Sequence, residues 1–434
     1  MPYDVIIVGG RLAGAATGML LARKGLRTLV VERTHFPSDT LSSHQLQPPG
    51  VARLRRWGLL DRLDATGTPP VRDVRFDVNG VVIAGQYPEI DGVGALYSPR
   101  REVLDTLLVE AAREAGAEVR EDTIVDELLL SEGRVRGIRS RRKGSASATD
   151  DHAALVVGAD GKHSMVAKTV GASSHRSRSA RSLGFYCYWQ DVELSAGELY
   201  NRDRRVAGAW PTDQGMVVTY VGWPASEFEV FRTDPAGHIL DTLDGCGTLG
   251  ERIRAGHRVG PVRGTSDLPN EIRVSSGPGW ALAGDAGLVM DSVTGQGMGH
   301  ALRDADLLSD AIISGLGGGG LDRALARYVK QRDKQTKSMF DFTVRIASFP
   351  PPTPAEQTMF AAIAERPEET SQLLGAVAGS VPITSLFSPQ RLISLTGVRG
   401  FAALARSQLR SVAARPAPVA ELPDRVGSRA RDDL

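Results

Sequence analysis

The chain has 434 residues, with 52 Lys or Arg and 51 Asp or Glu, so its formal net charge is only +1. This balance gives no electrostatic reason to expect a nucleic-acid partner, and the length predicts two or three domains. The only two cysteines, Cys187 and Cys246, exclude a disulfide framework and favour a reducing, cytoplasmic location. The first apolar run is short and lacks a preceding basic segment, so neither a signal peptide nor a membrane span is expected.

The first 33 residues predict a strand, a tight turn, a helix and a second, parallel strand. The first strand covers residues 5–8, the turn reads GGRLAG at residues 9–14, and Glu32 follows the second strand. Backbone N–H groups at such a turn favour a pyrophosphate, and an acid at Glu32 suits the ribose hydroxyls of an adenine dinucleotide. The residues expected to bind this ligand are Gly9, Gly10, Arg11, Ala13, Gly14, Glu32 and Arg33.

The turn departs from the usual G-x-G-x-x-G pattern at its second glycine, which here is Arg11. That glycine normally lets the ligand approach the backbone closely. The alternatives are a plain packing turn without a ligand, and an Arg11 side chain that points either at a phosphate or into solvent.

The next segments alternate between helical and strand patterns, and Asn79-Gly80 supplies a two-residue hairpin turn. The expected elements are a helix over 51–64, a hairpin over 74–83, a helix over 101–115 and strands over 124–130, 135–138 and 154–157. The polar stretch 139–151 indicates a solvated turn.

Aromatic residues and alternation dominate residues 179–265, which predicts an antiparallel sheet. Helical spacing returns after Gly284 and continues, after a glycine-rich break, to about residue 410. Residues 391–415 contain five arginines and no acid, which is typical of a surface helix, with membrane or partner contact as the alternative. Residues 415–434 are expected to be a disordered tail.

Two later motifs carry a resemblance to a known family. The first reads GADGKHS at residues 158–164, and the second reads AGDA at 283–286 followed by GQG at 295–297. With the N-terminal turn, in this order, they resemble the FAD-dependent hydroxylase superfamily, the class A flavoprotein monooxygenases. Geranylgeranyl reductases and flavin halogenases are related. The resemblance covers about residues 1–345.

The resemblance implies an α/β fold: a Rossmann-like FAD-binding domain of the glutathione-reductase type, an antiparallel β-sheet substrate domain and a C-terminal helical region. The expected FAD-binding domain is discontinuous, over 1–72, 97–178 and 266–345. The expected substrate domain covers 73–96 and 179–265, and the helical region 346–414.

The same resemblance implies roles for further residues. Asp285 would bind a ribityl hydroxyl of FAD, Arg101 would reach the FAD, and Asp160 would help to hold FAD and a transient NADPH. The free N–H groups of a helix that starts at the second motif would face the flavin; these residues are Gly295, Gly297 and Met298. Leu288, Ser292 and Gly299 depart from the family pattern, as Arg11 does.

No general acid or base is predicted, because a hydroxylating flavin carries the reactive oxygen and needs mainly a dry, shaped pocket. The residues considered for lining that pocket are His44, Gln47, Tyr188 and Trp210, each with packing or capping as the alternative. No metal-ligand spacing or phosphate-binding Walker loop is present.

The expected function is an FAD-dependent monooxygenase that uses NADPH and O2 to hydroxylate or epoxidise an aromatic or polyketide-like small molecule. One alternative is a flavin-dependent reductase of prenyl or enone double bonds, because Ala209-Trp210-Pro211 resembles a segment of geranylgeranyl reductases. Another is a non-catalytic flavin-binding or partner-binding protein. A halogenase is disfavoured because its tryptophan-rich signature is missing. A separate flavin reductase is the alternative electron source.

Overall fold

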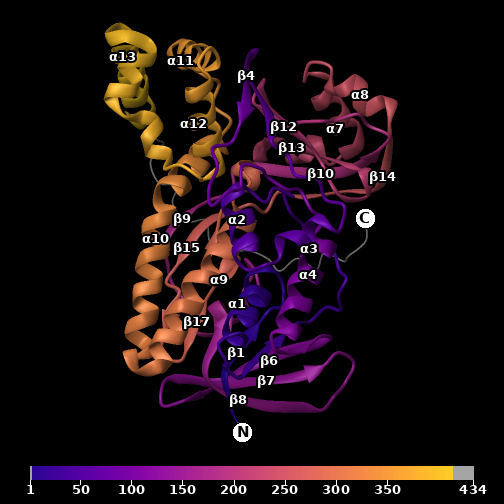
Figure 1. Ribbon diagram of the computed structural model, residues 1–434, viewed down its shortest axis with the longest axis vertical. Coiled ribbons are helices and arrows are strands. Elements are labelled where there is room, and N and C mark those ends of the chain that lie inside the picture. Colours follow the sequence, from indigo (N-terminus) through magenta and orange to yellow (C-terminus); the bar gives the residue numbers. More distant parts are fainter. Residues whose placement is uncertain (1, 414–434) are drawn as a thin grey trace.

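The computed structural model describes residues 2–413. The chain forms two large sheets at different levels along its long axis, with helices beside and above them (Figure 1). The predicted α/β fold class is confirmed. Among the helices of residues 2–413, none combines the length and the hydropathy that crossing a bilayer requires.

The first sheet has eight strands and contains the predicted strand-turn-helix-strand unit. Its order is β16-β17-β8-β1-β2-β5, with β6 and β7 attached through β8. Strand β1 pairs in parallel with both β2 and β8, which is typical of a sheet covered on both faces. The bounds are β1 (Tyr3–Val8), β2 (Thr28–Val31), β5 (Glu118–Arg120), β6 (Thr123–Ser131), β7 (Arg134–Arg142), β8 (Ala148–Gly158), β16 (Ser276–Gly277) and β17 (Trp280–Leu282).

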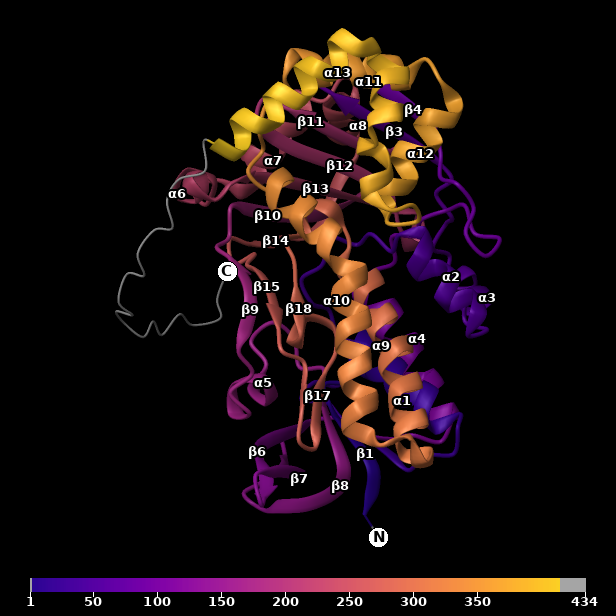
Figure 2. The same cartoon turned by 90° about the vertical axis from the view of Figure 1, so that its left-hand side faces the viewer.

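Helices α1, α4 and α9 pack together against this sheet, and α10 lies along α9 (Figure 2). Helix α1 is rich in small residues and is buried almost all round, so it can lie close to the strands. The helices of this part are α1 (Leu12–Ala22), α2 (Pro48–Arg56), α3 (Leu60–Asp64), α4 (Arg101–Glu114), α5 (Met165–Thr169), α9 (Gly297–Ser314) and α10 (Leu321–Ile346).

The second sheet has seven strands in the order β14-β10-β13-β12-β11-β3-β4. These strands lie within the two segments expected to form the substrate domain. The bounds are β3 (Asp73–Val78), β4 (Val81–Gln86), β10 (Ser182–Gln190), β11 (Gly197–Arg202), β12 (Arg205–Pro211), β13 (Val217–Pro224) and β14 (His257–Thr265). All neighbours are antiparallel except β11 and β3, which are parallel because β3 comes from a distant segment.

Two local expectations were wrong in part. The turn expected over 139–151 is confined to residues 143–147, because β7 and β8 extend into the stretch from both sides, where Arg139 lies directly opposite Asp150 and the two side chains form an ion pair. Residues 179–265 are not all sheet, because the chain leaves β13 to form three short helices that cover one face. These helices are α6 (Phe228–Phe231), α7 (Pro235–Asp244) and α8 (Leu249–Ala255).

The predicted C-terminal helices pack on the outer edge of the second sheet (Figure 2). Ile83 of β4 joins their apolar core. They are α11 (Pro354–Ala364), α12 (Pro367–Ala378) and α13 (Pro389–Ala413). A small third sheet links the two large ones and contains β9 (Ser174–Arg178), β15 (Asn270–Arg273) and β18 (Leu288–Val289). The tail expected over 415–434 lies outside the described residues.

Candidate FAD and substrate site

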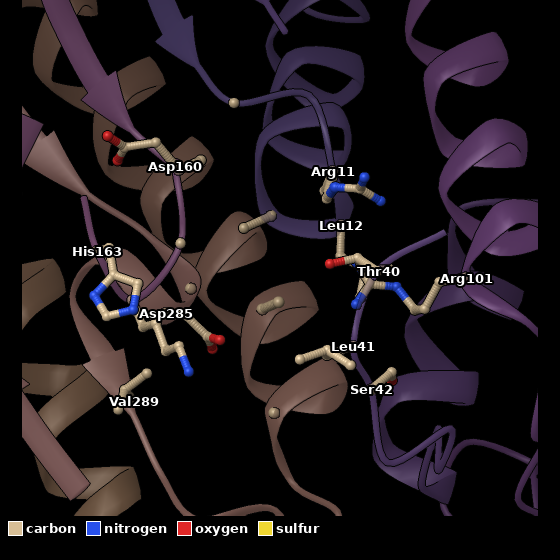
Figure 3. A pocket seen from close by; sticks show the side chains of 18 of the residues that line it. Arg11, Leu12, Thr40, Leu41, Ser42, Arg101, Asp160, His163, Asp285 and Val289 are labelled. Carbon is tan, nitrogen blue, oxygen red and sulfur yellow. The ribbon is translucent and has the colours of Figure 1, made fainter. Parts of the chain in front are cut away.

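A cavity of about 650 Å³ lies between the carboxyl ends of the parallel strands and the second sheet. A volume of several hundred Å³ is typical of sites for cofactors and small molecules. Figure 3 shows Asp160, His163 and Asp285 on one side of this cavity and Arg11, Leu41 and Arg101 on the other. The three motifs, which are far apart in the sequence, therefore meet at one place.

Two glycines of the N-terminal turn, Gly9 and Gly14, lie so close to other backbone atoms that no side chain would fit. Gly9 has a φ of 101°, which L side chains rarely adopt, and a Cβ there would lie 2.4 Å from the carbonyl oxygen of Ala159. A Cβ at Gly14 would lie 1.8 Å from the carbonyl oxygen of Gly9. The turn therefore packs tightly at the start of α1, and of the predicted turn residues Gly9, Arg11 and Ala13 line the cavity.

Glu32 is the acid of the first unit and also lines the cavity. Its Oε2 accepts a hydrogen bond of 2.7 Å from the backbone N–H of Gly10, and its Oε1 accepts two from Thr34. This carboxylate is held at the end of β2, where it can accept ribose hydroxyls. The neighbouring Arg33 is exposed and lines the same cavity.

The Arg11 side chain neither extends into solvent nor is left free to bind a phosphate, because other residues of the protein bind it. Its guanidinium hydrogen-bonds to Asp105, Ser38 and Asp39. Arg101, at the start of α4, also binds Asp105 and lines the cavity. The two arginines are therefore fixed by one carboxylate.

Asp160, in the GADGKHS motif, lines the cavity, but its carboxylate binds the local backbone. It accepts hydrogen bonds from the Ser164 hydroxyl and from the backbone N–H groups of Met165 and Val166. These bonds satisfy the free N–H groups at the start of α5. The Asp160 side chain thus caps the start of α5 and shapes the loop at the cavity wall.

Asp285 reaches the cavity from the turn after β17, and its side chain is exposed there. The surrounding protein disfavours the charged form and raises the pKa of Asp285 to about 6, against the opposing effect of the Arg101 charge. A carboxylate in this position can accept hydroxyl hydrogen bonds from a ligand. The site thus contains an acid that titrates close to neutral pH.

The start of α9 faces the same cavity. Gly297 and Met298 line it, and a Cβ at Gly297 would meet nothing within 4 Å. Gly295 does not line it: its φ of 62° and its contact with Gln45 serve the turn before the helix. Gly297 therefore leaves room for a ligand at a positively polarised helix end.

The second sheet contributes residues that sequence reasoning missed. Tyr186 on β10 and Tyr220 on β13 are directly opposite each other in the strand register, and both line the cavity. The Tyr220 hydroxyl lies 2.9 Å from that of Ser292, a position noted only as a departure from the family pattern. The alternation of β10 was the available signal, because Gly184, Tyr186 and Tyr188 share one face.

The four residues considered for the substrate pocket do not line this cavity. His44 and Tyr188 are one layer behind it, and bind each other. Trp210 packs inside the apolar core of the sheet, and Gln47 is buried just before α2. The alternative role in packing describes these positions, because neighbouring side chains rather than the cavity surround them; Gln47 precedes α2 but makes no capping hydrogen bond with its side chain.

The residues present fit a bound FAD. The cavity joins a tight glycine turn, an acid at the ribose position, Arg101, Asp285 and the start of α9. Leu41 is 47% exposed at the cavity wall, an apolar surface that an adenine or flavin ring would cover. This combination of phosphate-binding backbone, hydroxyl acceptors and apolar wall is what a flavin dinucleotide needs.

The chain is similar to several curated flavoenzymes. It is 25% identical to the digeranylgeranylglycerophospholipid reductase of Methanosarcina mazei, over 73% of this chain and 76% of that protein. It is 27% identical to the menaquinone reductase of Mycolicibacterium smegmatis, over 72% and 76% respectively.

Solved structures share the fold. The flavin-dependent brominase Bmp2 superposes with a TM-score of 0.75 at 17% identity, covering 95% of this chain and all of that one. PqsL, a probable FAD-dependent monooxygenase from Pseudomonas aeruginosa, gives 0.67 at 21% identity, covering 86% and 99%.

Residues 2–234 match the family model described as an FAD binding domain, which is more than half of the chain. The resemblance inferred from the three motifs is thereby confirmed. The protein is an FAD-dependent oxidoreductase and belongs to this FAD binding domain family.

Proposed function

We propose that the protein is a monooxygenase that uses NADPH and O2 to hydroxylate or epoxidise an aromatic or polyketide-like small molecule. The proposal rests on a cavity that runs from the FAD-binding residues to the face of the second sheet, so a cofactor and a substrate can share it. Its substrate end combines aromatic rings with a few hydroxyl groups.

The observation that carries the substrate class is the Tyr186 hydroxyl. Among the cavity-lining residues that the structure describes, Tyr186 is the one with a buried side-chain polar atom that has no hydrogen-bond partner. Leaving such a group unpaired is costly, and the hydroxyl oxygen itself is buried behind the cavity surface, so a small rotation of the Tyr186 side chain would let an oxygen atom of a ligand pair with it. We infer that the substrate is a largely apolar ring compound with a carbonyl or phenol oxygen.

The protein's own residues bind and orient the two reactants. Glu32, Arg101 and Asp285 hold the cofactor, while Tyr186 and the Tyr220–Ser292 hydroxyl pair orient the substrate. When bound, FAD supplies the redox chemistry, taking electrons from NADPH and enabling transfer of one atom of O2. The apolar wall formed by Val289 and Met290 limits water near the reacting atoms.

Product analysis with isotopically labelled O2 tests this proposal. Purified holoenzyme with NADPH and a panel of phenols, naphthoquinones and polycyclic ketones is expected to give a product that contains one labelled oxygen atom. The variant Tyr186→Phe is expected to raise KM for that substrate about tenfold, because one hydrogen bond to the substrate is lost. A panel in which no product contains labelled oxygen would contradict the proposal.

A reductase of carbon–carbon double bonds is the second candidate. It is favoured by the similarity to a digeranylgeranylglycerophospholipid reductase and a menaquinone reductase. The same assay separates the two functions, because a reductase product gains two hydrogen atoms and no labelled oxygen. A purely hydrocarbon chain would leave the Tyr186 hydroxyl unpaired, which favours an oxygen-bearing substrate for either reaction.

A further inference from the structure

Arg11 replaces the second glycine of the dinucleotide-binding pattern, and both terminal nitrogens of its guanidinium are hydrogen-bonded to the protein. Nη1 donates to Asp105 Oδ2 at 2.8 Å and to the Ser38 carbonyl oxygen at 3.2 Å. Nη2 donates to Ser38 Oγ at 3.0 Å and to the Asp39 carbonyl oxygen at 3.2 Å. A guanidinium has two N–H groups on each terminal nitrogen, so all four are used and only Nε–H is left for a ligand.

Asp105 links this arginine to the second one. The carboxylate is fully buried and accepts hydrogen bonds from Nε and Nη2 of Arg101. Arg101 lines the cavity. Its third nitrogen, Nη1, makes no hydrogen bond to any residue that the structure describes. With glycine at position 11, Asp105 would neutralise Arg101; with Arg11 present, the group keeps one net positive charge beside the expected pyrophosphate.

The same contacts fasten a chain segment over the site. Residues 38–39 lead directly into Thr40–Ser43, all of which line the cavity. This segment has no helix or strand of its own, so its position depends on side-chain contacts. Asp39 also lies 3.5 Å from Arg263 of β14, which connects the segment to the second sheet.

We propose that Arg11 is a positioning residue for FAD. It acts through Asp105 and the segment 38–43, and does not itself bind the phosphates. It offsets the negative charge of Asp105, so that the group of three residues keeps one net positive charge, and it holds residues 38–43 at the wall of the FAD site. Its backbone φ of −81° is ordinary for a non-glycine residue, so the replacement introduces no backbone strain.

The positioning role of Arg11 and the usual role of the second glycine in G-x-G-x-x-G predict opposite effects of the variant Arg11→Gly on FAD binding. If the second glycine served only close approach of the ligand, restoring it with Arg11→Gly would strengthen FAD binding. The present contacts predict the reverse, because the variant loses the tether of the segment and one positive charge. Arg11→Lys keeps the charge but cannot make the same forked contacts, so it separates the two contributions.

The first experiment measures FAD dissociation constants of refolded apoprotein by flavin fluorescence. Arg11→Gly is expected to bind FAD at least about tenfold more weakly than the wild type, and Arg11→Lys to lie between them. Far-UV circular dichroism of each variant verifies the fold, and Arg113→Gln on the outer part of α4 serves as the matched charge control. Unchanged or tighter FAD binding by Arg11→Gly would overturn the proposal.

The second experiment measures amide hydrogen exchange of residues 38–43 in the holoenzyme. Arg11→Gly, Arg11→Lys and Asp105→Asn are expected to accelerate exchange there, whereas Arg101→Gln is expected to weaken FAD binding with less effect on this segment. Unaltered exchange of residues 38–43 in Arg11→Gly would contradict the positioning role, because the hydrogen bonds from Arg11 to Ser38 and Asp39 would then not hold this segment. Neither measurement depends on oxygenation.

Discussion

The ring nitrogen Nε2 of His44 lies 2.6 Å from the hydroxyl oxygen of Tyr188, directly behind the cavity wall. The other ring nitrogen, Nδ1, lies 3.0 Å from the carbonyl oxygen of Ser42. Because a carbonyl can only accept, we assign the proton to Nδ1, and Nε2 then accepts the Tyr188 O–H. His44 is fully buried, and burial lowers its pKa from 6.5 to about 3. This pair therefore requires a neutral imidazole.

The neutral state of His44 predicts a pH-dependent stability. Between pH 6.5 and about 3 the unfolded chain binds a proton at His44 that the folded chain does not, so this residue makes the fold less stable as the pH falls. His44→Asn is expected to flatten that part of the Tm-against-pH profile, because asparagine does not titrate. It also tolerates the φ of 58° at this position. Identical slopes for the wild type and the variant would contradict the assignment.

Glu32→Gln is expected to weaken FAD binding about tenfold or more, because the charged acceptor for ribose hydroxyls is lost. FMN lacks the adenosine ribose, so its affinity is expected to stay the same. Titration of apoprotein with each flavin, followed by fluorescence, measures both values. Glu114→Gln on the exposed end of α4 is the matched control. Equal losses for FAD and FMN would place Glu32 away from the adenosine end.

Asp285 predicts a pH dependence of FAD binding. Its pKa is raised to about 6, so the carboxylate that we expect to accept ribityl hydroxyls is formed as the pH rises through that value. FAD affinity is expected to increase between pH 5 and 7, and Asp285→Asn to remove this increase. In the apoprotein the same raised pKa has the opposite effect on stability, which this residue lowers as the pH rises from 3.8 to about 6. A pH-dependent affinity that persists in Asp285→Asn would show that another group titrates.

Gln296 predicts a coupling between the FAD site and the C-terminal helices. Gln296 lies immediately before the start of α9. Its side-chain amide donates hydrogen bonds to the carbonyl oxygen of Thr294 and to that of Val377 in α12. Gln296→Ala is expected to destabilise the protein by about 1–3 kcal/mol and to accelerate hydrogen exchange in α12. The exposed Gln335→Ala on α10 is the control. Unchanged exchange in α12 would mean that other contacts hold these helices.

Local sequence patterns identified several residues that line the cavity. Glu32, Asp285 and Gly297 follow from short motifs, because a strand end or a helix start fixes where such residues lie relative to the backbone. The predicted superfamily is confirmed by the family match over residues 2–234. The individual ligand contacts of these residues stay predictions.

The substrate half could not be predicted in the same way. Tyr186 and Tyr220 meet only through the register of β10 and β13, and one residue of slippage would turn each ring to the other face. The role of Arg11 depends on Asp105, which is 94 positions away in the sequence. The ring of His44 is held by Tyr188, which is 144 positions away in the sequence. These features depend on tertiary packing, which short motifs do not encode.

Anaerobic titration of the FAD-reconstituted protein with NADPH, followed by its visible spectrum, shows whether the protein is a flavoenzyme that NADPH reduces. We expect the protein to bind FAD and NADPH to bleach the flavin absorption band. Readmission of air in the presence of a phenol or quinone is then expected to restore the band and give an oxygenated product. Bound flavin that NADPH leaves oxidised would contradict a self-sufficient monooxygenase, and a protein that fails to bind FAD would contradict the account as a whole.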